Sequence, residues 1–338
     1  ERKHESIKYR VPWPESFLQI LDEVLSNDAD GLFLQEVMFA SFDEDIGGLQ
    51  VPFAIHEAIT ALFGATNTPL LAYAGLTIAA ANLLATHGSD ELKEIWLRPL
   101  VEGRFFGTMA LSEPQAGSSL ADLLTVATPA PDGTHRIRGN KMWITNGCVA
   151  DVAVVWAKLD GRIRGFLVEK GTEGFSTTKQ EKKFSLRASI TSELHFQDCR
   201  IPKSNLLPEA DGLGGPLSCL TQARFGIAWG ATGAAMACFD AAKSYSLSRI
   251  QFDKPIASFQ LVQQKLAEMF TEITKAQLLN LRLSQLKESG KMTAQHVSMA
   301  KRNNVHWALE IARSARDLLG ANGVTHEYPV GRHMLNLE

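Results

Sequence analysis

Apolar residues recur at helical spacing through the last third of the chain. Between residues 261 and 286 they lie mostly three to five positions apart, which is typical of one face of an amphipathic helix. The same spacing runs from 292 to 319 and stops at Gly320 and Gly323, whose freedom at positive φ suits a helix C-terminus. A third helical pattern, at 219–248, is rich in Ala and Gly, which let another helix or a ligand approach closely. Together these patterns predict a bundle of long helices.

The middle of the chain has a different period. Three short apolar runs bounded by Gly and Asp predict β-strands, at residues 152–156, 163–168 and 194–201. Before Arg104 the helical spacing returns, with a further helix starting near Ser89 and earlier runs at residues 17–25, 32–42, 52–63 and 70–85. The order along the chain is therefore helical, then β, then helical.

A cluster of Pro and Gly at residues 207–216 predicts a linker between the strands and the bundle. With this boundary, we expect an α+β fold of three domains. They are an N-terminal helical domain (1–105), a middle β domain (106–212) and a C-terminal helical bundle (213–338).

Composition and charge narrow the class of function. The 34 Lys and Arg residues against 37 Asp and Glu give a formal charge of -3, which offers no electrostatic reason to expect nucleic acid or an anionic membrane. The most apolar stretch, 70–85, is too short and too often interrupted to span a bilayer, so we expect no membrane insertion. Four cysteines without a CxxC pair indicate a reducing compartment. The histidine spacing predicts no metal site, which leaves small-molecule chemistry as the starting hypothesis.

Two segments carry a family resemblance. FGTMALSEPQAGS at 106–118 and GNKMWITNG at 139–147 together resemble the paired flavin signatures of acyl-CoA dehydrogenases. Residues 139–338 are most similar to glutaryl-CoA dehydrogenase, whereas residues 34–120 look more like straight-chain bacterial acyl-CoA dehydrogenases. The family's fold is a helical domain, a β domain and a helical bundle. That order agrees with the periodicity, and the resemblance implies that the bundle here lacks its last part.

The resemblance implies FAD as the cofactor, between the β domain and the bundle. The flavin ring would contact two segments, which contain Met109, Ala110, Leu111, Ser112, Gly117, Ser118, Trp143, Ile144 and Thr145. A polar donor at Thr145 could tune the electron affinity of the flavin. Taken alone, Trp143 is more often a packed strand-edge aromatic than a cofactor platform.

Further FAD contacts would come from across a subunit interface. The resemblance assigns to them Arg249, Phe252, Gln260, Asp317, Leu318, Leu319, Gly320 and Ala321, with the guanidinium of Arg249 on the diphosphate. The alternative for Arg249 is a solvated residue at a helix end. These contacts imply a homotetramer built as a dimer of dimers.

Substrate contacts are implied along an acyl-CoA channel. Ser118 would face the CoA, and Leu217, Leu220 and Arg224 would follow the acyl chain, although Arg224 could equally be a structural ion-pair partner. Leu70 and Leu71 occupy positions where glutaryl-CoA dehydrogenases are expected to hold the distal carboxylate with an Arg. No Lys or Arg occurs from residue 11 to 92, so an uncharged acyl tail fits better.

The implied activity is α,β-dehydrogenation of an acyl-CoA, either glutaryl-CoA or a short- or medium-length straight-chain acyl-CoA, to the trans-2-enoyl-CoA, with electrons passed to an electron-transfer flavoprotein. This takes place in the cytoplasm if the source is bacterial and in the mitochondrial matrix if it is eukaryotic. The reaction needs a carboxylate base. In the glutaryl-type pattern the base falls beyond Glu338, and Ala223 occupies the other family position, so we assign no catalytic residue. The alternative is a flavin- or acyl-CoA-binding protein without dehydrogenation.

Overall fold

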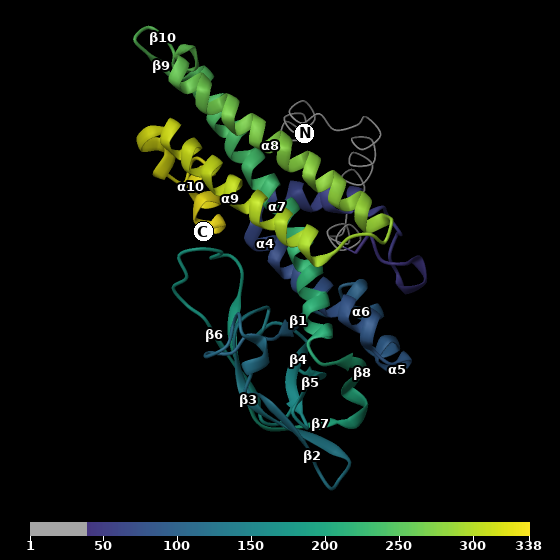
Figure 1. The fold of residues 1–338 in the computed structure, drawn as a ribbon. Coiled ribbons are helices and arrows are strands. Elements are labelled where there is room, and N and C mark those ends of the chain that lie inside the picture. The colour runs from purple at the N-terminus through teal and green to yellow at the C-terminus, as the bar shows by residue number, and fades with distance from the viewer. Residues whose placement is uncertain (1–38) are drawn as a thin grey trace. The chain divides into compact units, whose positions relative to one another are not determined.

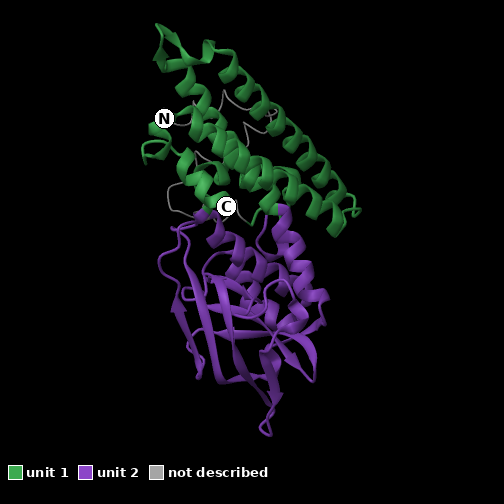
Figure 2. Cartoon of the chain, turned by 60° about the vertical axis from the view of Figure 1, so that its left-hand side comes forward, with its two compact units in different colours: residues 1–41, 49–68, 226–338 green, residues 42–48, 69–225 purple. Residues whose placement is uncertain are grey.

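The computed structural model describes residues 39–338 and divides into two compact units, which are coloured separately in Figure 2. Of the described residues, unit 1 contains 39–41, 49–68 and 226–338, and unit 2 contains 42–48 and 69–225. The expected helix at 17–25 and most of that at 32–42 lie outside the described residues. The division into three domains expected from the sequence stays a prediction.

The β-structure lies in unit 2. Within the described residues, one sheet has the strand order β6-β7-β3-β2-β4-β5-β8, and β1 pairs in parallel with β4. The strands are β1 (Gly107–Ala110), β2 (Val126–Pro129), β3 (Thr134–Thr145), β4 (Val152–Leu159), β5 (Arg162–Glu169), β6 (Phe175–Lys179), β7 (Thr191–Pro202) and β8 (Leu206–Asp211). The core of the sheet includes Val155, Phe166 and Leu194, which belong to three predicted strands. Those three strands are confirmed.

The predicted linker is wrong except at Gly212 and Leu213, because its first residues form a strand and the next helix begins at Gly214. Residues 206–211 form β8, an edge strand paired with β5, and only Gly212 and Leu213 separate it from the next helix. Leu207 and Ala210 of β8 are fully buried, and the Arg164 Nε donates to the Ala210 carbonyl at 2.8 Å. Pro208 misled the sequence argument because proline is tolerated on edge strands.

Helix α4 (Phe53–His87) contributes to both units and is interrupted at Asn67, which has φ −158° and ψ 90°. The break lies just before Pro69, because proline disfavours helical geometry immediately upstream. It confirms the sequence division into separate runs at 52–63 and 70–85. Unit 2 also contains α5 (Asp90–Leu92), a π-helical turn (Lys93–Leu97) and α6 (Arg98–Val101), and the Ser89 side chain accepts the Leu92 N–H at the start of α5.

The helices of unit 1 match the three predicted long patterns. They are α7 (Gly214–Ser248), whose first part belongs to unit 2, α8 (Gln260–Glu288) and α9 (Ala294–Leu318), followed by α10 (Val330–Leu337). A short hairpin, β9 (Ile250–Gln251) and β10 (Lys254–Pro255), joins α7 to α8, and the long helices run alongside one another in Figure 1. None of the described helices is both long and apolar enough to cross a membrane.

Small residues of α7 allow α4 to approach it closely within unit 1. A Cβ added at Gly233 would lie 1.8 Å from the Ala61 carbonyl oxygen, and one at Gly64 would lie 2.6 Å from the Gly230 carbonyl oxygen. Glycine is therefore required at both positions because any side chain would displace backbone. The close-approach interpretation of the Ala- and Gly-rich stretch is confirmed, and its partner is a helix.

Candidate functional site

Two segments predicted to act together lie side by side in unit 2. The Thr108 Oγ1 donates to the Thr145 carbonyl at 2.6 Å, and the Met142 N–H donates to the Ser112 carbonyl at 2.9 Å. These bonds join β1 and the loop after it to the C-terminal end of β3. Residues 108–112 and 142–145 are therefore neighbours, although 30 or more residues separate them in sequence. The candidate surface is made of the exposed and half-buried parts of residues 109–118 and 143–145.

Trp143 lies at a β-bulge in β3. The register against β7 shifts between Lys141 and Ile144, which leaves one extra residue in β3. Trp143 has φ +61°, a conformation that bulky residues seldom adopt, and 59% of it is exposed. The interpretation of Trp143 as a packed strand-edge aromatic is therefore wrong, because the bulge turns this side chain away from the core.

Three hydroxyl groups on the same surface have no protein partner. Among residues 39–338, the side chains of Ser112, Ser118 and Thr145 make no hydrogen bond, and all three are exposed or half-buried. A Cβ added at Gly117 would meet nothing within 4 Å. Met109 is half-buried, while Ala110, Leu111 and Ile144 are buried. An exposed aromatic ring beside unpartnered hydroxyls fits a planar ligand with a polar edge, which is the character of a flavin.

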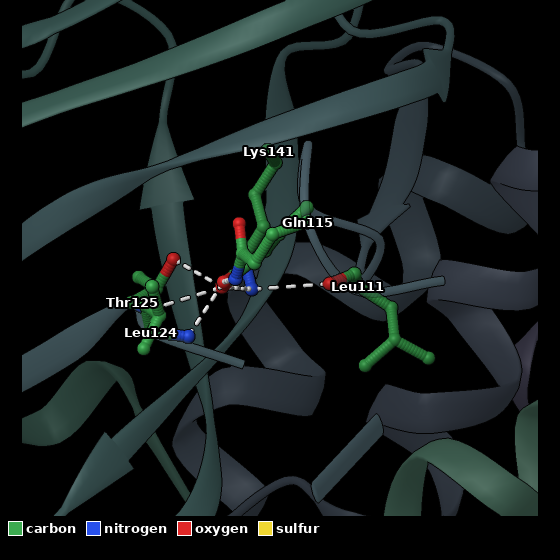
Figure 3. Close-up of polar contacts among 6 residues, drawn as sticks. Leu111, Gln115, Leu124, Thr125 and Lys141 are labelled. Atoms are coloured by element: carbon green, nitrogen blue, oxygen red, sulfur yellow. Dashed lines mark hydrogen bonds and ion pairs between the residues drawn. The ribbon is translucent and has the colours of Figure 1, made fainter. Parts of the chain in front are cut away.

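A buried ion pair lies beneath this surface (Figure 3). The Lys141 Nζ donates to the Glu113 carboxylate at 2.8 Å and to the Leu111 carbonyl at 3.2 Å. Thr125 and Leu124 also donate to Glu113, through the N–H of each and the Thr125 hydroxyl. Burial alone would raise the pKa of Glu113, but these donors outweigh it and lower the pKa to about 2. Burial lowers the pKa of Lys141 to about 8, so both groups are charged at neutral pH.

The second part of α4 is fixed against the same surface. The Asn146 Nδ2 donates to the Tyr73 carbonyl at 2.8 Å, and the Tyr73 hydroxyl donates to the Ala188 carbonyl at 3.1 Å. The Gly107 N–H donates to the Thr77 hydroxyl at 3.3 Å. Leu71 is half-buried in this part of α4, and the side chain of Leu70 lies outside what is described.

The first turns of α7 present the other predicted substrate residues. Leu217, Leu220 and Arg224 are spaced three and four apart, so they share one helix face. Leu217 is 41% exposed, and the other two are half-buried. The Arg224 guanidinium makes no ion pair or hydrogen bond with any residue from 39 to 338, so the structural ion-pair interpretation has no partner there. Ala223 is exposed on the same helix and offers no carboxylate.

The remaining predicted FAD residues lie in unit 1. Arg249 is exposed just after α7, Phe252 is 86% exposed at the hairpin tip with φ +52°, and Gln260 begins α8. After α9, the Asp317 carboxylate accepts from Lys265, Leu319 is buried, and Leu318, Gly320 and Ala321 are more exposed. The Asn322 Nδ2 donates to the Tyr245 hydroxyl at 3.0 Å, which links the loop after α9 to the end of α7. Their contact with FAD across subunits stays a prediction.

Comparison with known proteins identifies the family. The acyl-CoA dehydrogenase middle domain matches residues 108–199, and the acyl-CoA dehydrogenase C-terminal domain matches residues 210–338. The short-chain specific acyl-CoA dehydrogenase of Megasphaera elsdenii is 36% identical over 323 residues, which cover 94% of this chain and 83% of the relative. The chain belongs to the acyl-CoA dehydrogenase family. This confirms the predicted family, fold class and enzyme class, an oxidoreductase acting on acyl-CoA.

Solved structures of acyl-CoA dehydrogenases also superpose closely on this chain. A glutaryl-CoA dehydrogenase from Mycobacterium smegmatis superposes with a TM-score of 0.91 at 39% identity, covering 98% of this chain and 91% of that one. A glutaryl-CoA dehydrogenase from the same organism, in complex with FADH2, gives a TM-score of 0.87 at 36% identity and covers 99% of this chain and 86% of that one. FAD is the cofactor of the acyl-CoA dehydrogenase family, as predicted.

Sequence reasoning missed the Glu113–Lys141 pair of this acyl-CoA dehydrogenase. One signal was present in the sequence. Lys141 lies four residues after the fully buried Ile137 in β3, and because side chains alternate between the two faces of a strand, both lie on the buried face. A buried Lys needs a partner, and the nearest acidic residue in the flavin signature is Glu113. Among residues 39–338, no cluster of three His, Cys, Asp or Glu is arranged to hold a metal ion.

Proposed function

We propose that this acyl-CoA dehydrogenase oxidises the Cα–Cβ bond of an acyl-CoA thioester and forms the trans-2-enoyl-CoA, with FAD as cofactor. The observation that carries the proposal is the surface made by residues 109–118 and 143–145. There an exposed Trp143 lies beside hydroxyl groups that no described residue satisfies. Such a surface leaves polar groups and an aromatic ring available to a ligand.

The residues of this surface would hold the flavin and orient the thioester. When bound, FAD supplies the hydride acceptor. Residues 109–112 would line its polar edge through backbone groups and the Ser112 hydroxyl, Trp143 would cover one ring face, and Thr145 would donate from its hydroxyl. Ser118, at the exposed end of the loop, would contact the CoA.

We propose an uncharged acyl tail as substrate. The helix that carries Leu70 and Leu71 contains no Lys or Arg, and Lys93 is the first Lys or Arg after Arg10. Burying a distal carboxylate without a paired cation costs several kcal/mol. Leu217 and Leu220 would add apolar side chains to the wall of the acyl site, and Arg224 would lie near the reacting end of the acyl-CoA. The similarity comparisons support both substrate classes at nearly equal identity, so this choice rests on the residues.

The proposed reaction requires a carboxylate that removes the α-proton. Ala223 supplies none, and the Glu338 carboxylate accepts from the Arg313 guanidinium at 2.5 Å, which favours a structural role for Glu338. A second candidate function is that this chain binds flavin and acyl-CoA without dehydrogenating it. The experiment below separates the two.

The exposed residues of unit 1 would complete the cofactor site in an assembly. We propose that Arg249, Phe252 and Gln260, together with residues 317–321, contact the diphosphate and adenine of FAD bound by a neighbouring subunit of a homotetramer. This assignment is supported by the exposure in one chain of Arg249, Phe252, Gln260, Asp317, Gly320 and Ala321, whereas Leu319 is buried. Reduced flavin would be reoxidised by an electron-transfer flavoprotein, which an assay of dye reduction with and without that protein tests.

The decisive experiment is an anaerobic titration of FAD-loaded protein with butyryl-CoA and, separately, with glutaryl-CoA, followed at the oxidised flavin absorbance. Bleaching by butyryl-CoA alone supports dehydrogenation of an uncharged acyl chain. Bleaching by glutaryl-CoA refutes the argument from the missing cation. A spectral shift without bleaching by either thioester supports the binding function. The Arg224→Met variant is the matched test of the α7 face and should weaken thioester binding.

A further inference from the structure

The backbone carbonyls of residues 111–113 all accept hydrogen bonds from other described residues. The Leu111 carbonyl accepts from the Lys141 Nζ at 3.2 Å, and the Ser112 carbonyl accepts from the Met142 N–H at 2.9 Å. The Glu113 carbonyl accepts the Ala116 N–H at 3.1 Å, which closes a tight turn. The inner side of this loop is therefore held at three consecutive peptides.

The opposite side of this loop carries hydrogen-bond donors that no described residue uses. The peptide that joins Leu111 to Ser112 is trans, so its carbonyl and its N–H point in opposite directions. Because the carbonyl faces the fully buried Lys141, the Ser112 N–H faces away from the core. Among residues 39–338, neither this N–H nor the Ser112 hydroxyl has a hydrogen-bond partner.

The Glu113 carboxylate anchors the loop from the other end. One of its oxygens accepts from the Thr125 N–H at 3.0 Å, the Thr125 hydroxyl at 2.5 Å and Lys141 at 2.8 Å. The other accepts from the Leu124 N–H at 2.5 Å and the Gln115 Nε2 at 2.7 Å. Five donors on one carboxylate fix it more tightly than an apolar contact would, because each bond has a required direction.

We propose that the buried Lys141–Glu113 pair is a positioning device that orients the Leu111–Ser112 peptide toward the flavin and strengthens its N–H as a donor. An ammonium at the carbonyl end polarises the peptide, since hydrogen bonds in a chain reinforce one another. The Ser112 N–H then presents a stronger positive end to the polar edge of the ring. The inference rests on the proposed function, because it names how the same surface holds FAD.

The alternative is that the pair serves stability alone. Replacing a buried ion pair by apolar or neutral groups of similar size is often neutral or stabilising, whereas removing one partner is strongly destabilising. The two roles therefore diverge in a double variant, Lys141→Met with Glu113→Gln. A pair that serves stability alone can be removed together without consequence for the flavin.

The test compares FAD affinity and flavin reduction potential in wild type, Lys141→Met, Glu113→Gln and the double variant. Cofactor-free protein is titrated with FAD and followed by flavin fluorescence, and the potential is measured by dye equilibration. We expect Lys141→Met and the double variant to bind FAD about tenfold more weakly or worse, with a more negative potential, even where the double variant melts at the wild-type temperature. Arg138→Met, which removes an exposed cation from the same strand, is the control and should change neither quantity.

Wild-type affinity and potential in a folded double variant would overturn the proposal. If the double variant fails to fold, Lys141→Gln with Glu113→Gln decides, because it leaves no unpaired buried charge and keeps polar side chains that can bond to each other, and it should show the same weaker FAD binding and more negative potential. A failure of wild-type protein to bind FAD would instead refute the proposed function. The two failures are therefore distinguishable.

Discussion

Glu57→Gln should remove the pH dependence of stability that arises from one buried site in unit 1. Glu57 lies in the first part of α4 and is buried, and one of its carboxylate oxygens accepts no hydrogen bond from the described residues. Burial raises the pKa of Glu57 from 4.5 to about 7, an effect that the charge of Lys287 opposes. The carboxyl is therefore largely protonated in the folded protein up to near-neutral pH.

The direction in which the stability changes with pH follows from the number of protons that the folded and unfolded states bind. Between pH 4.5 and about 7 the folded state keeps a proton that the unfolded chain has lost, so wild-type stability falls as the pH rises through this window. At about 1.4 kcal/mol per pKa unit, the shift corresponds to roughly 3 kcal/mol, of which about 2 kcal/mol is lost between about pH 5 and pH 7. Glutamine mimics the protonated acid at every pH, so the variant lacks this loss.

The measurement is urea unfolding of wild type and Glu57→Gln at several pH values from about 5 to 7, which keeps at least about one pH unit below the pKa of Lys287, lowered to about 8 by burial. The free energy of unfolding of the variant should gain about 2 kcal/mol relative to wild type across this range. The control is Glu288→Gln, an exposed neighbour on α8 that accepts the Phe53 N–H. Parallel curves for wild type and Glu57→Gln would refute the reasoning.

Two further predictions concern the flavin surface and the helix contact. Thr145→Val should retain the fold and slow flavin reduction by substrate about tenfold, because it removes the hydroxyl without changing the size of the side chain; an unchanged rate in stopped flow contradicts the assigned role. Gly233→Ala should destabilise the protein by about 3 kcal/mol, since the added methyl lies 1.8 Å from the Ala61 carbonyl oxygen. Gly75→Ala, where nothing lies within 4 Å, should stabilise it by about 0.5 kcal/mol, and equal thermal shifts for the two glycine variants would count against the packing argument.

The elements that sequence predicts well here are those with a long, regular period. Helices α7, α8 and α9 each repeat their apolar spacing over many turns, so their ends agree with the pattern to within a few residues except at the start of α7. The short strands β1 and β2 give too few residues for a period to show. Strand β8 was missed because Pro208 and the glycines after it indicate a linker by composition, whereas pairing with β5 decides the structure.

The candidate site likewise has parts that a local sequence pattern predicts and parts that it does not. Segments 106–118 and 139–147 were found because each is a continuous motif, and hydrogen bonds hold them side by side in the structure, while their contact with flavin stays a prediction. The Glu113–Lys141 pair and the bulge at Trp143 depend on contacts between distant segments and on one extra residue in β3, so a local pattern does not specify them. The division of α4 and α7 between two units is likewise a property of three-dimensional contacts and not of composition.

The order in which the two units are encoded has a consequence for synthesis on the ribosome. Residues 69–225 of unit 2 leave the ribosome before residues 226–338, which complete unit 1. The turn of α4 that contains Ala61 and Gly64 packs against Gly230 and Gly233, which are synthesised only after strands β1 to β8. Unit 2 can fold during translation, while the earlier half of α4 remains without its partner, a nascent state in which apolar surface is open to aggregation or to chaperones.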